Sequence, residues 1–314
     1  MSLTQLITRA EEGVQAPAVN VEVHISNGLP SFSIVGLPEA AVRESRDRVR
    51  SAIINSGFQF PARKITVNLA PADLPKEGGR YDLAIALGIL ASSQQINSQN
   101  LQGVELYGEL ALSGDLRPVG GLLPALIQTG NHTNKAILPQ ANAAEASIIN
   151  HLDARLAGNL AQICSALNGG TPLPGAPEFE QEHSMYYLQD ISEVIGQSQA
   201  KRALEIAAAG GHHMLMMGPP GTGKSMLAHR LITLLPEMDQ QDALQTLSIH
   251  SITNDHSLDI DNWKIRPFRA PHHTVSGIAL VGGGSNPRPG EISLAHNGVL
   301  FLDELTEFER RHNI

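Results

Sequence analysis

The stretch HMLMMGPPGTGKSMLAHRLITLL, residues 213–235, decides the fold of the second half of this chain. It contains the pattern G-x-x-x-x-G-K-[ST], with Gly218, Gly223, Lys224 and Ser225 at its fixed positions. An apolar run at residues 214–217 precedes the pattern, and apolar residues at helical spacing follow it. This order predicts a strand whose methionines fill a buried layer, a phosphate-binding loop (P-loop) and a helix.

The residue types of this loop suit a polyphosphate. Glycines let the loop curl so that backbone N–H groups point at phosphate oxygens, and the following helix turns its positive end toward them. We expect Lys224 to reach the β- and γ-phosphates and the Ser225 hydroxyl to ligate Mg²⁺. The sequence therefore predicts a MgATP site, whose binding residues are Gly218, Pro219, Pro220, Gly221, Thr222, Gly223, Lys224, Ser225 and Met226.

The stretch GVLFLDEL, residues 298–305, is predicted to supply the other half of this site. Its apolar residues precede Asp303 and Glu304, as in a buried strand that ends in acids. Asp303 would hold Mg²⁺ together with Ser225, and Glu304 would polarise the water that attacks the γ-phosphate. By itself this pattern is equally typical of an ordinary strand end, but the upstream P-loop favours catalytic roles for Lys224, Asp303 and Glu304.

Length and composition indicate a soluble protein with two domains. The chain has 314 residues, of which 42% are hydrophobic and 17% charged. Cys164 is the only cysteine, which rules out an intrachain disulfide and fits a reducing compartment. The sequence lacks a signal-peptide pattern and an apolar run of membrane-spanning length. We therefore expect a cytoplasmic protein that does not use a membrane as partner.

The net charge of −9 gives no general attraction to nucleic acid, so any DNA contact must be local. The densest basic cluster lies at residues 43–50, where acids interrupt the arginines. Both a nucleic-acid surface and a solvated helix face fit this cluster, and the interruptions favour the solvated face.

Residues 1–168 alternate between strand-like and helix-like stretches, which predicts an α+β domain. We expect a hairpin of residues 19–26 and 31–37, and further strands at 64–71 and 104–112. Helices are predicted at residues 39–56 and 82–93. Prolines and glycines then indicate a linker over residues 169–187, and a second domain over residues 188–314.

Several motifs resemble known ATPases. The segment V-I-G-Q at residues 194–197 resembles the one that packs on adenine in AAA+ ATPases, which implies that Ile195 and Gly196 contact the base; a core position fits Ile195 equally well. Residues 266–305, RPFRAPHHTVSGIALVGGGSNPRPGEISLAHNGVLFLDEL, resemble the magnesium-chelatase-like AAA+ proteins called YifB or ComM. The resemblance extends through residues 36–90.

This resemblance implies an α/β fold in which an N-terminal domain precedes a P-loop AAA+ domain with a parallel sheet. It also implies ATP and Mg²⁺ as cofactors, ATP hydrolysis and a homo-hexamer. Members resemble DNA motors of the helicase type, and ComM proteins promote branch migration during natural transformation. A magnesium-chelatase-like metal-inserting motor and a protein-remodelling ATPase are the alternatives that the resemblance leaves open.

The N-terminal half is similar to the proteolytic domain of Lon proteases, whose fold is that of ribosomal protein S5 domain 2. In Lon the nucleophilic serine follows a P-K-[DE]-G-P segment, and here residues 75–79 lead to Arg80. The Lon lysine follows Gly-Gly-Leu, and here residues 120–122 lead to Leu123. Neither side chain can perform the dyad's chemistry, so we expect a docking or DNA-contacting module and not a protease.

His272 and His273 form a pair that permits two hypotheses. Imidazole ligates metals, but adjacent histidines rarely share one ion, and no acid or cysteine cluster accompanies them. We favour the hypothesis that residues 269–276 and the loop at 282–284 face the substrate or a neighbouring subunit near the ATP.

AAA+ ATPases continue beyond the acidic pair with a sensor strand, an arginine finger and a helical lid. This sequence stops at Ile314, and its final residues, HNI, depart from the family. We therefore expect a truncated ATPase domain, and an inactive remnant is a further alternative to the two motor functions.

Overall fold

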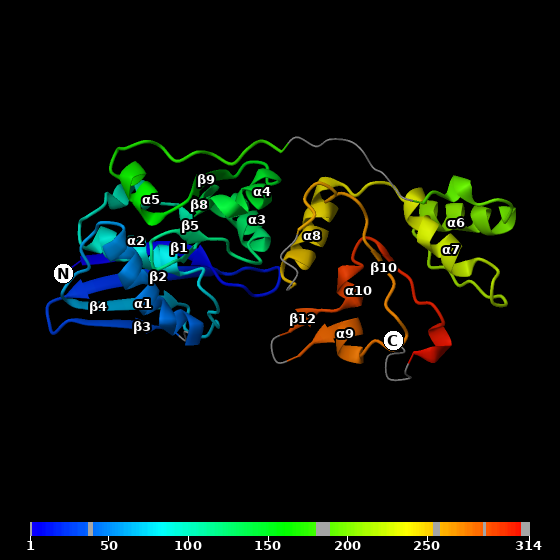
Figure 1. The fold of residues 1–314 in the computed structure, drawn as a ribbon, viewed down its shortest axis with the longest axis horizontal. Coiled ribbons are helices and arrows are strands. Elements are labelled where there is room, and N and C mark those ends of the chain that lie inside the picture. Colours follow the sequence, from blue (N-terminus) through cyan, green and yellow to red (C-terminus); the bar gives the residue numbers. More distant parts are fainter. Residues whose placement is uncertain (1, 37–39, 180–188, 254–257, 285–286, 309–314) are drawn as a thin grey trace. The chain divides into compact units, whose positions relative to one another are not determined.

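The computed structural model describes residues 2–36, 40–179, 189–253, 258–284 and 287–308. The chain divides into two compact units, Met1–Glu180 and Gln181–Ile314 (Figure 1). Both contain helices and strands, so the fold class is α/β. Among the described helices, none has the length and apolar character that crossing a bilayer requires.

A seven-stranded sheet forms the centre of the first unit. Its strand order is β3-β4-β2-β1-β5-β8-β9; β1–β2 and β2–β4 pair antiparallel, and the other four pairs are parallel. The strands are β1 (Ser2–Arg9), β2 (Ala18–Ser26), β3 (Ser31–Val35), β4 (Lys64–Ala70), β5 (Glu105–Leu106), β8 (Lys135–Pro139) and β9 (Asp153–Ala157). A separate ribbon consists of β6 (Glu109–Leu110) and β7 (Leu116–Arg117).

Helix α2 (Asp82–Ser92) lies in the core of this unit and is buried along its whole length. It packs on β1 and β2 on one side and on α1 (Ala40–Asn55) on another, which explains why its sequence is apolar on all faces. Gly88 permits this close packing, since a Cβ at that position would lie 2.5 Å from a Val23 methyl. The remaining helices are α3 (Leu123–His132), α4 (Ala143–Ser147), α5 (Leu160–Leu167), η1 (Ser98–Leu101) and η2 (Gln140–Asn142).

The predicted hairpin of β2 and β3 is wrong. The chain reverses at residues 27–30 as expected, but β4 lies between the two strands, so that Ser26 and Ser31 both pair with Lys64. The turn residues determine only the reversal; a loop of four residues can equally span two strand spacings of about 4.8 Å each. Strand β4 fills the gap because its alternating apolar residues complete the buried face.

The strand predicted at residues 104–112 is also interrupted. It forms β5 and β6 in two different sheets, because the Gly108 carbonyl accepts a hydrogen bond from the Leu83 N–H instead of a ladder partner.

Of the predicted linker, residues 180–187 lie outside the described residues. Its earlier part bonds to the edge of β9, where Leu156 N–H donates to Pro174 and Ala176 N–H donates to Ala154.

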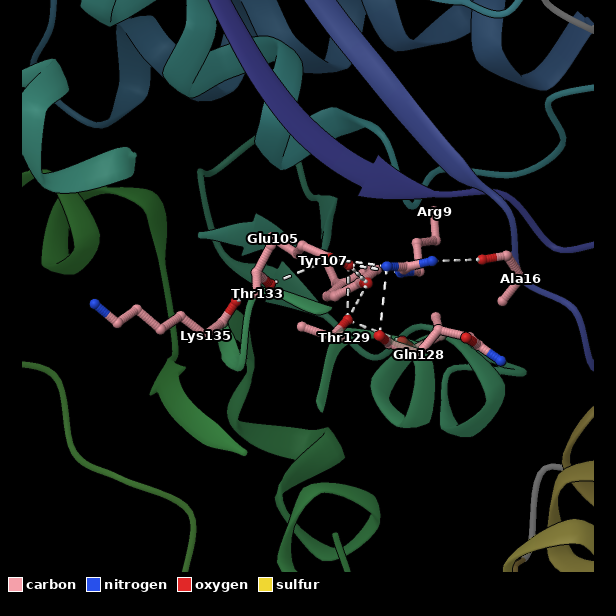
Figure 2. Close-up of polar contacts among 9 residues, drawn as sticks. Arg9, Ala16, Glu105, Tyr107, Gln128, Thr129, Thr133 and Lys135 are labelled. Carbon is pink, nitrogen blue, oxygen red and sulfur yellow. Dashed lines mark hydrogen bonds and ion pairs between the residues drawn. The ribbon is translucent and has the colours of Figure 1, made fainter. Parts of the chain in front are cut away.

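A buried ion pair ties β1 to β5 (Figure 2). The Arg9 guanidinium donates from Nε and Nη2 to the two Glu105 oxygens at 2.7 and 2.9 Å. Tyr107 and Thr129 hydroxyls each lie 2.7 Å from Glu105 Oε2. Burial by itself would raise the Glu105 pKa, but the hydrogen bonds from Arg9, Tyr107 and Thr129 lower it below the ordinary value.

The second unit is built mainly from helices and very short strands. Its helices are α6 (Ser198–Gly210), α7 (Lys224–Arg230), α8 (Gln240–Ser251), α9 (Gly277–Val281), α10 (Glu291–Leu294), η3 (Ile191–Glu193), η4 (Leu231–Leu234) and η5 (Leu305–Glu307). Its strands are β10 (Phe268–Arg269), β11 (Gly282–Gly283), β12 (Arg288–Pro289) and β13 (Val299–Leu300). The β10–β13 pair is parallel, and β11–β12 is antiparallel.

The strand predicted before the P-loop does not form. Residues 214–217 pair with no strand among the described residues, and Met214 and Met217 are 36% and 86% exposed, so the prediction that they fill a buried layer is wrong. Met216 packs partly against the small cluster of Val194, Leu204 and Leu227. An apolar run becomes a strand only where a neighbour completes its ladder, and β10 and β13 bond to each other.

Candidate functional site

The loop that precedes α7 has the curled backbone that the glycine pattern predicts. Gly221 and Gly223 have φ angles of +80° and +85°, a region that favours glycine. Within the described residues, no backbone carbonyl accepts a hydrogen bond from the N–H groups of residues 221–225. These donors are therefore available for an anion, as a phosphate cradle requires.

Hydrogen bonds within the loop hold this shape. The Lys224 ammonium donates to the carbonyl oxygens of Gly218 and Pro219 at 2.9 and 3.1 Å. The Thr222 hydroxyl donates to the same Pro219 carbonyl at 2.9 Å. The lysine side chain thus folds back over the start of the loop.

Helix α7 packs its Ser225 face on the β10–β13 pair. Ser225 and His229 are four residues apart and share one side of the helix. The His229 ring lies 4.7 Å from the Phe268 ring on β10 and 5.9 Å from the Phe301 ring, which follows β13. This aromatic contact holds one side of the helix against the strand pair.

The two predicted halves of the site meet at Ser225 and Asp303. The Ser225 hydroxyl donates to Asp303 Oδ2 at 2.8 Å, across 78 positions of sequence. The other carboxylate oxygen, Oδ1, accepts the Glu304 N–H at 3.0 Å. A hydroxyl and a carboxylate oxygen are hard donors of the kind that Mg²⁺ prefers, so the residues fit the ion.

Glu304 has an unusual backbone. Its φ and ψ of 54° and 48° lie in the left-handed region, which costs a non-glycine residue about 1–3 kcal/mol and is common at functional sites. The Oε2 atom of its side chain lies 3.4 Å from His273 Nδ1. The two neighbouring acids therefore have different partners.

The segment at residues 194–197 lies against the P-loop. The Gln197 side chain donates to the Thr222 carbonyl at 3.2 Å, and Gly196 has a φ of +73°. Ile195 is 97% exposed and therefore is not a core residue, whereas its neighbour Val194 is buried. This leaves an apolar side chain free beside the loop.

Three residues of this site were given no role of their own in the sequence prediction: Gln197 and His273, which lie in segments expected near the nucleotide, and His229. The only signal for His229 was its spacing of four from Ser225.

Within the described residues, no group of three or more His, Cys, Asp or Glu side chains is arranged to hold a metal ion. His272 instead contacts the Thr274 hydroxyl at 2.9 Å through Nδ1.

In the first unit, the segments that resemble the Lon dyad lie together but carry other chemistry. The Arg80 guanidinium donates to the Gly120 carbonyl at 2.9 Å and forms an ion pair with Glu11. Leu123 is fully buried. The Lys76 ammonium donates to the Pro71 carbonyl, and burial lowers its pKa. No nucleophile stands at either dyad position.

The site thus has a glycine-rich loop that precedes a helix, and a serine hydroxyl on that helix bonds to an acid that follows a parallel strand. This combination defines a P-loop protein of the α/β class. The family model described as "Magnesium chelatase, subunit ChlI" matches residues 190–313, and "Subunit ChlI of Mg-chelatase" matches residues 21–142. The chain belongs to the YifB/ComM family of magnesium-chelatase-like AAA+ proteins.

Relatives of this family align along almost the whole chain. Competence protein ComM of Haemophilus influenzae is 53% identical over 99% of this chain and 62% of its own length. The uncharacterized protein YifB of Escherichia coli is 54% identical over 99% of this chain and 61% of its own length. The chain thus spans about three fifths of these curated relatives. An archaeal Lon protease from Archaeoglobus fulgidus is 46% identical over 17% of this chain.

Proposed function

We propose that this chain binds MgATP at residues 218–226 and belongs to a protein that hydrolyses it. The observation that carries the proposal is the 2.8 Å hydrogen bond between the Ser225 hydroxyl and the Asp303 carboxylate, because it joins the loop that would hold the phosphates to the acid that would hold the ion. The exposed Ile195 beside the loop supports a contact with the base.

The proposed roles follow from this geometry. Loop N–H groups and Lys224 bind the β- and γ-phosphates, and Ser225 and Asp303 hold Mg²⁺, which supplies neutralising charge. Glu304 accepts a proton from water while the water oxygen bonds to the γ-phosphorus. The bond from that phosphorus to the bridging oxygen breaks, and ADP leaves with the electron pair.

Equilibrium binding of a fluorescent ATP analogue tests the binding step. We expect saturable binding to this chain, and affinity at least about tenfold weaker in Lys224→Ala, since one charged contact to phosphate is worth roughly 1.5–3 kcal/mol. Circular dichroism of both proteins is the control for folding. Binding that is equally tight in Lys224→Ala would contradict the site.

We further propose that the protein acts on DNA as a motor of the helicase type, assembled as a homo-hexamer in the cytoplasm. The support is family membership and a relative that is named a competence protein. The matching family models, named for a magnesium chelatase subunit, favour a second candidate, a motor that inserts metal or remodels a protein. ATPase stimulation by branched DNA would favour the first, and stimulation by a porphyrin or protein partner the second.

The first unit is proposed to dock a partner or DNA, because it keeps the segments of the Lon-like fold without a nucleophile. Residues 269–276 and the loop at 282–284 are proposed to face the substrate or a neighbouring subunit. Loss of ATP-stimulated DNA binding in His272→Ala, with nucleotide affinity unchanged, would support this second proposal, and unchanged DNA binding would contradict it.

A further inference from the structure

The second unit has an open pocket on the face of β10 that is turned away from α7. Phe268 of β10 places its ring 4.7 Å from the His229 ring of α7. Because successive residues of a strand point to opposite faces, Pro267 and Arg269 are directed away from that helix. Both line a pocket of about 570 Å³, to which the proposed nucleotide site contributes no residue. The pocket and the P-loop therefore lie on different faces of the strand.

The walls of this pocket suit the body of a small organic molecule. Leu247 of α8, Ile265 of the loop before β10 and Leu294 of α10 supply apolar surface. His250 of α8 adds a polar group whose Nε2 lies 2.9 Å from the Leu294 carbonyl oxygen. Burial lowers the His250 pKa, so its ring is neutral near pH 7. Small-molecule sites have volumes of about 300–1,000 Å³ and combine apolar walls with a few polar groups.

Arg266 brings into this pocket a cation that no acid neutralises. Its Nε donates to the Pro236 carbonyl at 2.7 Å, and its Nη1 donates to the Asn297 carbonyl at 2.6 Å. Within the residues that the structure describes, this half-buried guanidinium forms no ion pair, and its Nη2 makes no hydrogen bond. A guanidinium held only by neutral carbonyls keeps its full charge and a free donor, which fits a carboxylate or phosphate.

The other charged side chains that line the pocket already have partners. Arg269 donates two hydrogen bonds to Glu291, at 2.6 and 2.7 Å. The Asp259 carboxylate accepts hydrogen bonds from the backbone N–H and the side-chain amide of Asn262. Arg266 is therefore the cation that is left for a ligand.

We propose that this pocket binds a small organic anion, whose carboxylate or phosphate pairs with Arg266 and whose apolar body lies against Leu247, Ile265 and Leu294. Carboxylates and phosphates share the chemistry that a guanidinium recognises. The site is separate from residues 218–226, so the inference does not depend on the proposed ATP binding or hydrolysis.

Displacement of a fluorescent dye tests the ligand chemistry in the unchanged chain. The probe is 1-anilinonaphthalene-8-sulfonate, an aromatic anion, and excess MgATP is present throughout to compete for the P-loop. We expect benzoate or phenyl phosphate to displace the dye, and the more effective of the two identifies the anionic group. Benzamide has a similar body without the charge and should compete at least about tenfold less well. Equal competition by benzamide, or none by either acid, would overturn the proposal.

Arginine variants test the location. Arg266→Gln should bind the dye about tenfold more weakly, and Arg266→Lys, which keeps the charge, should lose less. The matched control is Arg202→Gln, which removes an exposed arginine of α6 and should leave dye affinity unchanged. Circular dichroism checks that each variant is folded, and the comparison of benzoate with benzamide needs no variant.

The Lys224→Ala variant separates this inference from the proposed function. It should lose ATP affinity and keep the dye affinity of the unchanged chain. Dye affinity that falls in Lys224→Ala but not in Arg266→Gln would place the dye in the P-loop and overturn the inference, with the ATP site intact. A chain that binds the dye through Arg266 but binds no ATP would overturn only the proposed function.

Discussion

The proposed chemistry depends on single side chains, and the sequence pointed to most of the side chains near the P-loop. Lys224 and Ser225 belong to one local motif, whose spacing alone specifies the curl of the loop. The contact of Glu304 with His273 could not be predicted, because it depends on the register of two strands whose paired residues, such as Phe268 and Val299, lie 31 positions apart in the sequence. Such a register is set by packing and not by local sequence.

Glu145 makes the stability of the first unit depend on pH. Burial raises its pKa to about 7 from 4.5, although the hydrogen bond from Asn142 and the charge of Arg80 lower it. The folded state therefore prefers the protonated acid. Its contribution to stability is complete below pH 4.5 and is lost as the pH rises toward 7.

We predict that Glu145→Gln gains stability relative to the unchanged chain as the pH rises from 5 to about 8. Glutamine cannot ionise and so avoids the cost of a buried charge. Urea unfolding at both pH values measures the difference, with the exposed Glu12→Gln as control. A Glu145→Gln difference that is the same at the two pH values would contradict the assignment.

Among the elements, β1 and β5 depend on the Arg9–Glu105 pair (Figure 2). Both side chains are almost completely buried, so removal of one charge leaves the other without compensation. We predict that Glu105→Gln lowers the free energy of unfolding by about 3–5 kcal/mol. Denaturant unfolding followed by circular dichroism measures this loss.

The pH dependence of this pair has the opposite sign to that of Glu145. The Glu105 pKa is lowered in the folded state, so its stabilisation is present above the unfolded value of 4.5 and is lost as the pH falls. The cost of Glu105→Gln should therefore shrink in acid. The control is Glu109→Gln, which breaks an exposed pair with Arg117 and should cost less than about 1 kcal/mol. Equal losses in the two variants would contradict the prediction.

Elements with a clear apolar pattern could be predicted, and their partners could not. The helix at residues 82–93 and the strand at 64–71 were confirmed as α2 and β4 within a residue or so of their ends. The insertion of β4 between β2 and β3 was not predicted, because turn residues specify a reversal and not a pairing. The exposed run at residues 214–217 shows the same limit of prediction. Its apolar residues suggest a strand, but they do not specify a second strand to which its backbone could bond.

In the whole molecule, the first unit contains a complete core of its own. The cluster that runs from Leu6 to Leu173 lies entirely within Met1–Glu180. We predict that residues 1–180 fold alone and unfold in one cooperative transition. Cys164 is buried there, and burial raises its pKa to about 12, so a thiol reagent should label it only after unfolding. Rapid labelling of this fragment without denaturant would contradict the prediction.

The central claim is that one Mg²⁺–nucleotide site joins residues 218–226 to Asp303, and the Mg²⁺ dependence of ATP affinity tests it most directly. Titration calorimetry with Mg²⁺ and with a chelator should show tighter binding with the ion in the unchanged chain. Ser225→Ala and Asp303→Asn should lose most of that gain and keep the weaker, ion-free binding through the loop. A folded chain that takes up no ATP, or an Asp303→Asn variant with the full Mg²⁺ effect, would contradict the account.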